Sequence, residues 1–332
     1  MPNLRDIEKR INSVSSTKQI TRTMEMVATA KIRRATDRMV SSTPYSNSMI
    51  EMLSYVKSRV QDTDNPLFCK HEVTENVLII VVASDRGLAG GFNSSIFRHV
   101  EKLKKEKEAT GATVQIVACG KKTIGYFTYR KVIPVLEFRD LSADPSAEEA
   151  NEIAAYAMGA YADGSLDEVI VVYNHTKNAA EQILREEVIL PLDPEVLSNI
   201  HLGSFGGTKS NAAHANDASA VAAQTLIDSA ISSAEEAVGQ STRVTTGDIA
   251  FEPDEKSVLN RLIPAYVRSV IYHALIDSAA AEQGARRSAM KAATDNANEM
   301  VESLSRVYNR VRQGAITTQL TEIVSGAAAM EE

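Results

Sequence analysis

The chain has 332 residues, with 36 Lys and Arg against 43 Asp and Glu, so its net charge is −7. Free nucleic-acid-binding proteins usually carry the opposite sign, and the charge therefore argues against a nucleic-acid partner. Hydrophobic residues make up 44% of the chain, which excludes wholesale disorder, whereas aromatic residues at 5%, with no Trp, favour closely packed helices over an aromatic-rich sheet core.

The N-terminal segment, residues 1–60, predicts one long coiled-coil helix. Its apolar residues step by three and four, as in a coiled-coil seam, and the seam shifts by one residue at Ile20 before it resumes at Met24. Pro44 is expected to kink or interrupt the helix, because proline lacks the N–H that the helix ladder needs. A continuous helix from residue 3 to residue 60 would be roughly 85 Å long.

Residues 70–202 predict a Rossmann-like α/β domain with a mostly parallel sheet. The unbroken apolar run at 75–84 is typical of a strand that is buried on both faces. Strands then alternate with helices, which favours parallel strands joined by helical crossovers. The expected strands are 75–84, 113–119, 131–136, 168–174 and 182–190, and the expected helices are 94–107, 121–129 and 146–163.

The remaining sequence predicts a flexible insertion or linker followed by a second long helix. Residues 203–247 are rich in Gly, Ser, Ala, Asn and Thr, as linkers are, with one amphipathic helix at 221–238. Residues 254–326 predict the second coiled-coil helix, with Pro264 as an alternative first-turn position. Two helices of these lengths cannot be buried in one compact domain, so they are expected to pair with each other and to project from the α/β domain. The seam of the second helix is expected at Ala293, Ala297, Met300, Leu304, Val307 and Val311.

The segment 84–91, SDRGLAGG, follows the first expected strand and precedes a helix, where α/β proteins often bind phosphates. It matches neither GxGxxG nor GxxxxGK[ST], which favours a structural or docking turn over a nucleotide site. The six histidines lack metal-ligand spacing, so each is interpreted as solvated or as a satisfied polar residue. The two cysteines, Cys69 and Cys119, form no CxxC and predict a reducing compartment. No catalytic residue, cofactor or metal site is therefore expected.

Residues 1–40 form a basic helix on an acidic protein, with nine Lys and Arg against four acids. Two interpretations remain open: a solvated coiled-coil face, or docking to an acidic partner surface. The N-terminal sequence does not resemble a secretory signal, and the longest apolar run is far short of the ~20 residues of a membrane span. Membrane association is therefore expected only through a partner.

Three blocks resemble the gamma-subunit family of the bacterial F-type ATP synthase. They are LRDIEKRINSVSSTKQITRTMEMVATAKIRRA at 4–35, ASDRGLAGGFNSSI at 83–96, and AMKAATDN at 289–296 with RQGAITTQLTEIVSGAAA at 312–329. The resemblance implies a rotary central stalk that couples ion flow to ATP synthesis or hydrolysis and is itself non-catalytic. The implied partners are the alpha and beta subunits, whose hexamer surrounds the coiled coil, the epsilon subunit, and the c-subunit ring. One copy per complex would lie at the cytoplasmic face of the bacterial cell membrane.

The resemblance also implies partner contacts at three places in the chain: the basic helix, which would face loops of the beta subunits, the central loop, and the C-terminal tip. The implied residues are Arg22, Met24, Lys31, Arg33 and Arg34 in the first place, Asp85 and Arg86 in the second, and Arg312, Gln313, Thr317 and Glu322 in the third.

The chain departs from the family pattern in two places. Gln319 stands where the family signature I-T-x-E-x-x-E has its first Glu. The 203–247 segment is longer than is usual for bacterial members and holds no cysteine, which does not support the thiol regulation of chloroplast members. Two other classes remain as alternatives: an α/β nucleotide-binding enzyme with coiled-coil arms, which would need a phosphate-binding lysine or metal carboxylates near Asp85, and a coiled-coil adaptor, which leaves the polar tail unexplained.

Overall fold

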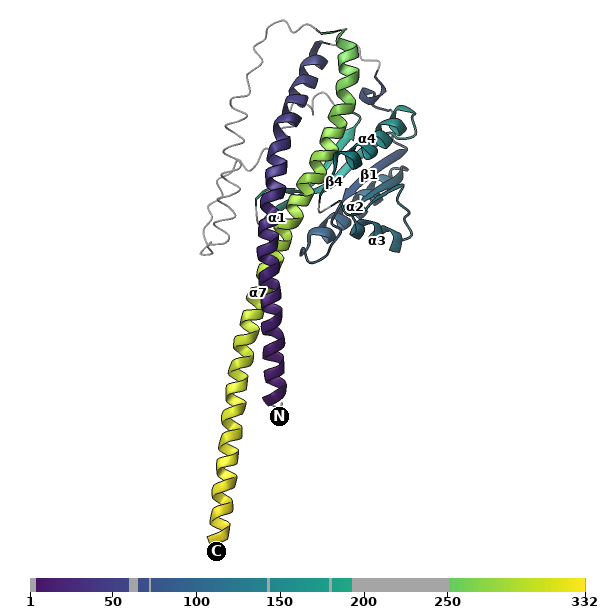
Figure 1. The fold of residues 1–332 in the computed structure, drawn as a ribbon. Helices are drawn as coiled ribbons and strands as arrows, with labels where there is room; N and C mark the ends of the chain where they lie inside the picture. The colour runs from purple at the N-terminus through teal and green to yellow at the C-terminus, as the bar shows by residue number, and fades with distance from the viewer. Residues whose placement is uncertain are drawn as a thin grey trace. The chain divides into compact units, whose positions relative to one another are not determined.

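The structure is a computed structural model that describes residues 4–59, 65–71, 73–141, 144–178, 181–192, 251–252 and 254–331 (Figure 1). These residues form two compact units, one from Ala28–Arg286 and the other from Met1–Val27 with Arg287–Glu332. The expected insertion at 203–247, with its helix at 221–238, lies outside the described residues.

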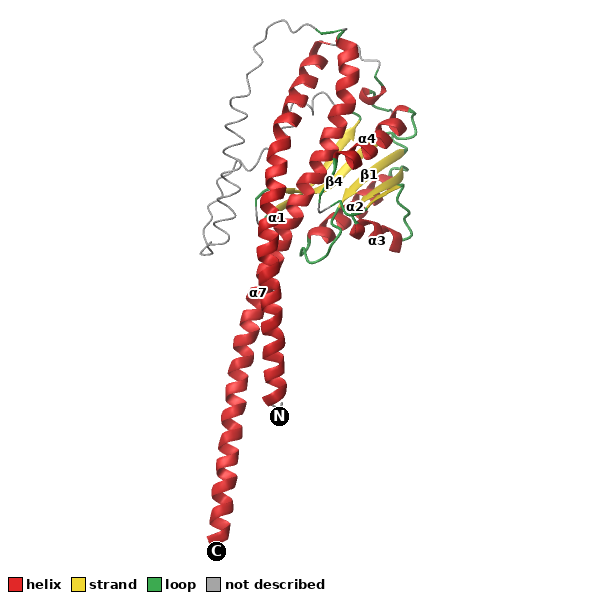
Figure 2. Cartoon of the chain, in the orientation of Figure 1, coloured by secondary structure: helices red, strands yellow, loops and turns green. Residues whose placement is uncertain are grey.

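Two long helices occupy the ends of the chain, and shorter helices alternate with strands between them (Figure 2). The expected elements at 113–119, 121–129 and 182–190 are confirmed with the same bounds. The described elements are α1 (Leu4–Arg59), η1 (Pro66–Phe68), β1 (Asn76–Val82), α2 (Phe92–Ala109), β2 (Thr113–Cys119), α3 (Lys121–Tyr129), β3 (Leu136–Phe138), α4 (Ala147–Ala162), β4 (Glu168–Thr176), β5 (Gln182–Leu190) and α7 (Glu255–Glu331).

The described strands form one five-stranded sheet in the order β3-β2-β1-β4-β5. Strand β1 pairs in parallel with β2 and β4, β2 pairs in parallel with β3, and only β5 is antiparallel to its neighbour. The expectation of a mostly parallel sheet is therefore confirmed. The apolar runs of β1 and β4 are buried because helices cover both faces of the sheet.

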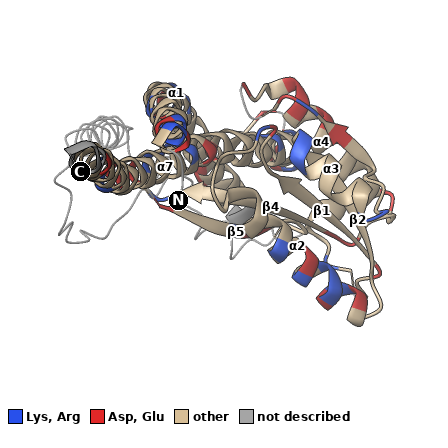
Figure 3. Ribbon diagram, turned by 90° about the horizontal axis from the view of Figure 1, so that it is seen from below, with Lys and Arg blue, Asp and Glu red and all other residues tan. Residues whose placement is uncertain are grey.

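Different helices cover the two faces of this sheet. On one face, α4 packs with residues 50–56 of α1 and residues 259–275 of α7. On the other face lie α2 and α3, joined by Ala281 and Ala285 of α7. Helix α2 is amphipathic: its apolar side is buried, and its outer side alternates Lys and Arg with Glu (Figure 3). The residues of α7 thus reach the cores of both faces.

The third expected strand is wrong in its bounds. The prediction was 131–136, whereas β3 comprises only Leu136–Phe138. Lys131 adopts a left-handed conformation with φ of 60°, and Pro134 has no N–H to donate to a neighbouring strand. The chain therefore joins the sheet only after the proline.

The two prolines do not interrupt the terminal helices. Pro44 lies inside α1, where the hydroxyls of Ser42 and Thr43 both donate to the carbonyl of Met39 in the preceding turn. The interruption expected there is not found. Pro264 is interior to α7 and is not its first turn, because the helix begins at Glu255. Asp254 directly precedes α7 and accepts hydrogen bonds from the backbone N–H and the hydroxyl of Ser257, as an N-cap does.

In the unit formed by Met1–Val27 and Arg287–Glu332, α1 and α7 lie side by side and antiparallel. The expected seam shift at Ile20 is wrong: Ile20 is 60% exposed, and the seam continues instead through Thr21, which is 8% exposed. The hydroxyls of Thr21 and Thr294 lie 2.8 Å apart across this seam. The shift looked necessary only because a threonine occupies a position that apolar residues usually fill.

The seam of α7 also differs from the prediction at two positions. Met300 and Val307 are exposed, and the half-buried residues are their C-terminal neighbours, Val301 and Tyr308. Ala297 is buried as expected. The pairing of Thr21 with Thr294 places Leu4 opposite Val311, so α7 continues beyond Leu4, the first residue of α1 that the structure describes.

Candidate functional site

The strand order reverses between β1 and β4, and this point defines the site. From β1 the chain moves outward through β2 to β3, and then crosses back by way of α4 to β4 on the other side of β1. In open α/β sheets, ligands bind in the crevice outside the carboxyl ends of the two strands at such a switch point. Here those ends are Val82 of β1 and Thr176 of β4.

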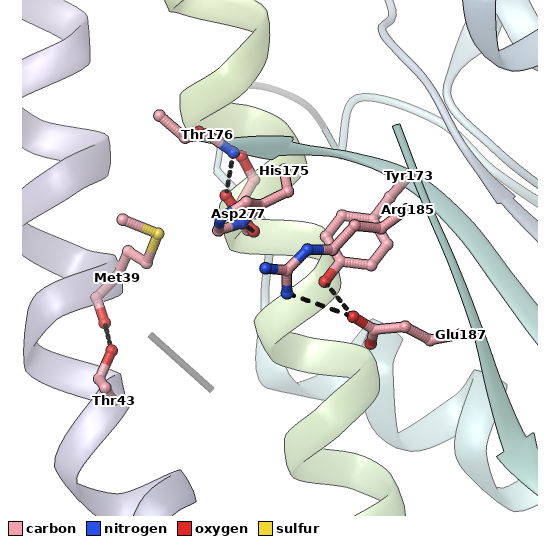
Figure 4. Close-up of polar contacts among 8 residues, drawn as sticks. All are labelled: Met39, Thr43, Tyr173, His175, Thr176, Arg185, Glu187 and Asp277. Carbon is pink, nitrogen blue, oxygen red and sulfur yellow. Dashed lines mark hydrogen bonds and ion pairs between the residues drawn. The ribbon is translucent and has the colours of Figure 1, made fainter. Parts of the chain in front are cut away.

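Helix α7 occupies this position through Asp277 (Figure 4). One carboxylate oxygen accepts the backbone N–H of Thr176 at 2.9 Å, and the other lies 2.5 Å from Nδ1 of His175. The Thr176 hydroxyl donates to the Asp277 carbonyl at 3.3 Å. Both side chains of this contact are buried, with 5% exposure for His175 and 0% for Asp277. An ionised carboxylate can only accept, so this contact fits a His175 tautomer with its proton on Nδ1.

A second contact joins α7 to the loop after β1. Arg286 donates from Nη2 to the carbonyl of Gly87 at 3.3 Å, and from Nη1 to the side chain of Gln283 at 3.1 Å. Its guanidinium also pairs with Glu282, one turn earlier on the same helix. The carboxyl end of β4 and the loop after β1 therefore both bind α7, which lies where other α/β sheets bind a ligand.

Behind this contact lies a second polar cluster on β4 and β5 (Figure 4). The hydroxyl of Tyr173 donates to Glu187 at 3.0 Å, and Arg185 approaches the same carboxylate at 3.4 Å. Burial, together with the nearby carboxylates Glu187 and Asp277, raises the pKa of Tyr173 well above its ordinary value. Tyr173 therefore stays protonated and donates its proton to the Glu187 carboxylate.

His273 on α7 makes stability depend on pH. Burial lowers the pKa of its imidazole below 6.5, Asp277 and Glu187 oppose that shift, and His175 and Arg185 reinforce it. Its Nδ1 is buried and has no hydrogen-bond partner among the residues that the structure describes. The His273 imidazole binds a proton more readily in the unfolded chain than in the folded one. The contribution of the neutral His273 to the free energy of unfolding is therefore complete above pH 6.5 and is lost as the pH falls below that value.

We expect the free energy of unfolding of the full chain to fall between about pH 7.5 and about pH 5.5, by up to ~1.4 kcal/mol per pH unit from this group. In the variant His273→Gln the dependence should be shallower. Urea denaturation at both pH values measures the slopes, and equal slopes in the two proteins would contradict the assignment.

The glycine-rich loop after β1 is closed by its own hydrogen bonds. Ser84 donates to Asn93 from its backbone N–H at 3.0 Å and from its hydroxyl at 2.9 Å. The Asp85 carboxylate accepts the backbone N–H groups of Lys121, at the start of α3, and of Asp140. Arg86 is exposed. Asp85 therefore organises the loop, and Arg86 is left at the surface.

The candidate residues of α1 differ in exposure. Arg22, Lys31, Arg33 and Arg34 are exposed. Met24 is half-buried in a shallow groove that is also lined by Ser16, Gln19, Ile20 and Thr23.

The candidate residues of the tip all lie exposed on the last turns of α7: Arg312, Gln313, Thr317 and Glu322. The Thr317 hydroxyl donates to the carbonyl of Gln313, one turn earlier. The pairing of Thr21 with Thr294 sets Arg22 opposite Ala293, so Arg312 lies roughly 28 Å farther along α7. The structure therefore does not bring the tip residues and the Arg22–Met24 segment together.

Sequence reasoning did not identify the contact between β4 and α7. His175 was interpreted as solvated or as a satisfied polar residue, and the second description is right for it. Asp277 was not singled out, although it and Arg286 are charged residues that flank an alanine-rich stretch of α7. A lone carboxylate beside a run of small residues is the signal that could have indicated a buried polar contact.

The described residues offer neither a membrane-spanning helix nor a cluster of metal ligands. No helix among them is both long and apolar enough to cross a membrane. Nor do three His, Cys, Asp or Glu side chains gather as metal ligands in the part of the chain that the structure describes.

Comparison with known proteins gives a consistent result. The ATP synthase family profile matches residues 3–330. The chain is 36% identical over 326 residues to an ATP synthase gamma chain of Leptospira biflexa, covering 98% of each, and 34% identical to one of Chlorobium phaeobacteroides, covering 100% of this chain and 99% of that one.

Solved structures with a similar fold include a chain of the Euglena gracilis mitochondrial ATP synthase in rotational state 3. The TM-score is 0.58 at 19% identity, over 98% of this chain and 94% of that one. A chain of the Tetrahymena thermophila mitochondrial ATP synthase central stalk and c-ring gives a TM-score of 0.52 at 23% identity, over 82% of this chain and 99% of that one. At these identities, the likeness supports the fold.

Proposed function

This chain belongs to the ATP synthase gamma chain family, the rotary central stalk of the F-type ATP synthase, and we propose that it performs this role without catalysing any reaction itself. The observation that carries the proposal is the switch point of the sheet. The crevice where open α/β sheets bind a substrate or nucleotide is occupied by Asp277 and Arg286 of the chain's own helix.

The same observation weighs against the alternative of an α/β nucleotide-binding enzyme. The loop after β1 would have to offer free backbone N–H groups to a phosphate. Instead, the N–H of Ser84 is bound by Asn93. The cationic Arg286 side chain of the chain itself contacts the loop at the Gly87 carbonyl. The Asp85 carboxylate, which could have held a metal, accepts two backbone N–H groups.

The proposed partners are the alpha and beta subunits around the two terminal helices, the epsilon subunit, and the c-subunit ring. One copy would serve each complex at the cytoplasmic face of the bacterial membrane, attached only through these partners. The exposed basic residues of α1 support contacts with acidic loops of the beta subunits, because complementary charge guides and orients such surfaces. They are Arg22, Lys31, Arg33 and Arg34, with Met24 on the same helix.

A reconstitution experiment tests this role. Purified alpha and beta subunits should hydrolyse ATP in a sustained way only when the full chain is added, and the chain alone should show neither ATPase activity nor tight ATP binding. Tight, stoichiometric binding of ATP by the chain alone would remove the proposal of a non-catalytic rotor.

The tip of α7 is proposed to contact the inner surface of the beta subunits at some rotary angles and to release it at others. Arg312→Ala and Gln313→Ala should each lower steady-state ATP hydrolysis by about tenfold, the order expected when a hydrogen bond to a charged group is lost. Assembly should be nearly unchanged, because both side chains are exposed on the helix. Arg310→Ala, another exposed arginine of α7, is the control, and wild-type turnover in both tip variants would make these contacts incidental.

A further inference from the structure

We propose that a polar joint, made by His175, Thr176 and Asp277 on one side of α7 and by Gly87 and Arg286 on the other, fixes the rotational position of α7 on the sheet and so transmits torque between them. The inference rests on the proposed rotary function and names the residues that would make the α/β domain and α7 turn together.

Large apolar side chains of α7 pack into the core before the joint, at residues 259–275, and mostly small side chains follow within it. Between the two halves of the joint, α7 buries the small residues Ser278, Ala279, Ala280, Ala281 and Ala285, with the longer Glu282 and Gln283 among them. Small side chains let the helix approach closely, but they interlock weakly with their neighbours. Hydrophobic attraction also has no preferred direction. Hydrogen bonds weaken steeply when their angle changes, so they can define one orientation of the helix.

The two halves of the joint hold α7 from opposite sides. Asp277 and Arg286 are nine residues apart, which is about two and a half turns at 3.6 residues per turn. Their side chains therefore leave the helix in nearly opposite directions. One reaches the end of β4 and the other the loop after β1. Contacts on both sides of the α7 axis can pass a torque from the sheet to the helix. A contact on one side alone would let the helix turn about that contact.

The Asp277 half is the stronger one. Its carboxylate is fully buried and meets both His175 and the backbone N–H of Thr176, so rotation of the helix would strand a charge away from water. Breaking a buried pair on one side is strongly unfavourable for that reason. The joint therefore resists rotation in either direction.

The test compares ATP hydrolysis with ATP-driven proton pumping in membrane vesicles that carry the whole complex. The main variant is the double change His175→Phe with Asp277→Leu. It replaces the His175 and Asp277 side chains with apolar ones, a change that buried charge pairs often tolerate, and it leaves the Thr176 N–H without its Asp277 acceptor. We expect assembly and ATP hydrolysis within about twofold of wild type, and protons pumped per ATP to fall by about tenfold, as for the loss of a hydrogen bond to a charged group.

Two further variants complete the comparison. Asp277→Asn keeps an oxygen for the Thr176 N–H and should retain more pumping per ATP than the apolar pair. Glu152→Gln removes a charge from an exposed position of α4 and should pump as wild type does. A merely structural role for the ion pair predicts that the apolar pair pumps normally, and that result would overturn the proposal.

Arg286→Ala tests the proposal if the buried double variant does not assemble. Arg286 is only half-buried, so its replacement should leave the complex able to assemble. Pumping per ATP should fall in this variant also, and a wild-type ratio there would overturn the proposal. If the wild-type complex itself did not pump protons, the proposed function would fail, whereas normal pumping in the wild type and in the variants would remove only the joint.

Discussion

Replacing Gly120 with Ala should destabilise the α/β domain by about 3 kcal/mol or more, because two separate costs coincide there. Gly120 follows β2 with φ of 100° and ψ of 143°, a region that is essentially confined to glycine. A Cβ atom at this position would lie 2.3 Å from the carbonyl oxygen of Ala83, which is backbone and cannot move aside as a side chain could.

The position matters because Gly120 holds three strand ends together. Its N–H donates to the carbonyl of Phe138 at the end of β3, and Ala83, after β1, donates to the carbonyl of Cys119 at the end of β2. A shift of the backbone at residue 120 would disturb both hydrogen bonds. The loop after β1, which receives Arg286, begins at the same place, so the damage should extend toward the joint.

Urea denaturation of the full chain measures the effect, and Gly125→Ala provides the matched control. Gly125 lies inside α3, and a Cβ added there meets no atom within 4 Å. That substitution should stabilise the domain by about 0.5–1 kcal/mol, since alanine is the better helix former. If Gly120→Ala had the same denaturation midpoint as the wild type, the steric argument at Ala83 would be wrong.

The parts of the fold that follow from local patterns could be predicted from the sequence. The apolar, β-branched run of β1 is typical of a doubly covered strand, and β2 and α3 have the bounds that their residues indicate. The position of β3 depends on one proline and one left-handed residue, Lys131, whose conformation no hydrophobic pattern records.

The contacts between distant segments could not be predicted, because their residues are common and their spacing is long. Asp277 and Thr176 are 101 residues apart in the chain, and nothing in either segment specifies the other. The wrong seam position predicted at Ile20 of α1 has a related cause. A hydrophobic pattern selects Ile20 over Thr21, whereas the structure buries Thr21 because Thr294 offers it a hydroxyl across the seam. A polar pair of this kind fixes the register of two helices at some cost in stability.

The candidate residues of the basic helix lead to the second prediction. Met24→Lys should uncouple the complex without unfolding the helix pair. Met24 is half-buried in a groove beside Ile20 and Thr23, and it lies on a helix proposed to face loops of the beta subunits. A lysine there keeps the length of the side chain, and its methylenes can cover the groove while the ammonium reaches outward. The structure of the chain itself should therefore tolerate the change.

The consequence should appear in coupling, because a new charge at a partly dry interface acts differently at each rotary angle. Close charge pairs across interfaces have measured couplings of about 1.5–7 kcal/mol, enough to favour one angle over the others by tenfold or more. ATP hydrolysis should stay within about twofold of wild type, while protons pumped per ATP fall several-fold in vesicles assayed for both.

Met26→Lys is the matched control, since Met26 is two residues away and 60% exposed. Two residues turn a helix by about 200°, so its lysine points away from the groove. Equal pumping in Met24→Lys and the wild type would mean that this part of α1 does not face the beta subunits.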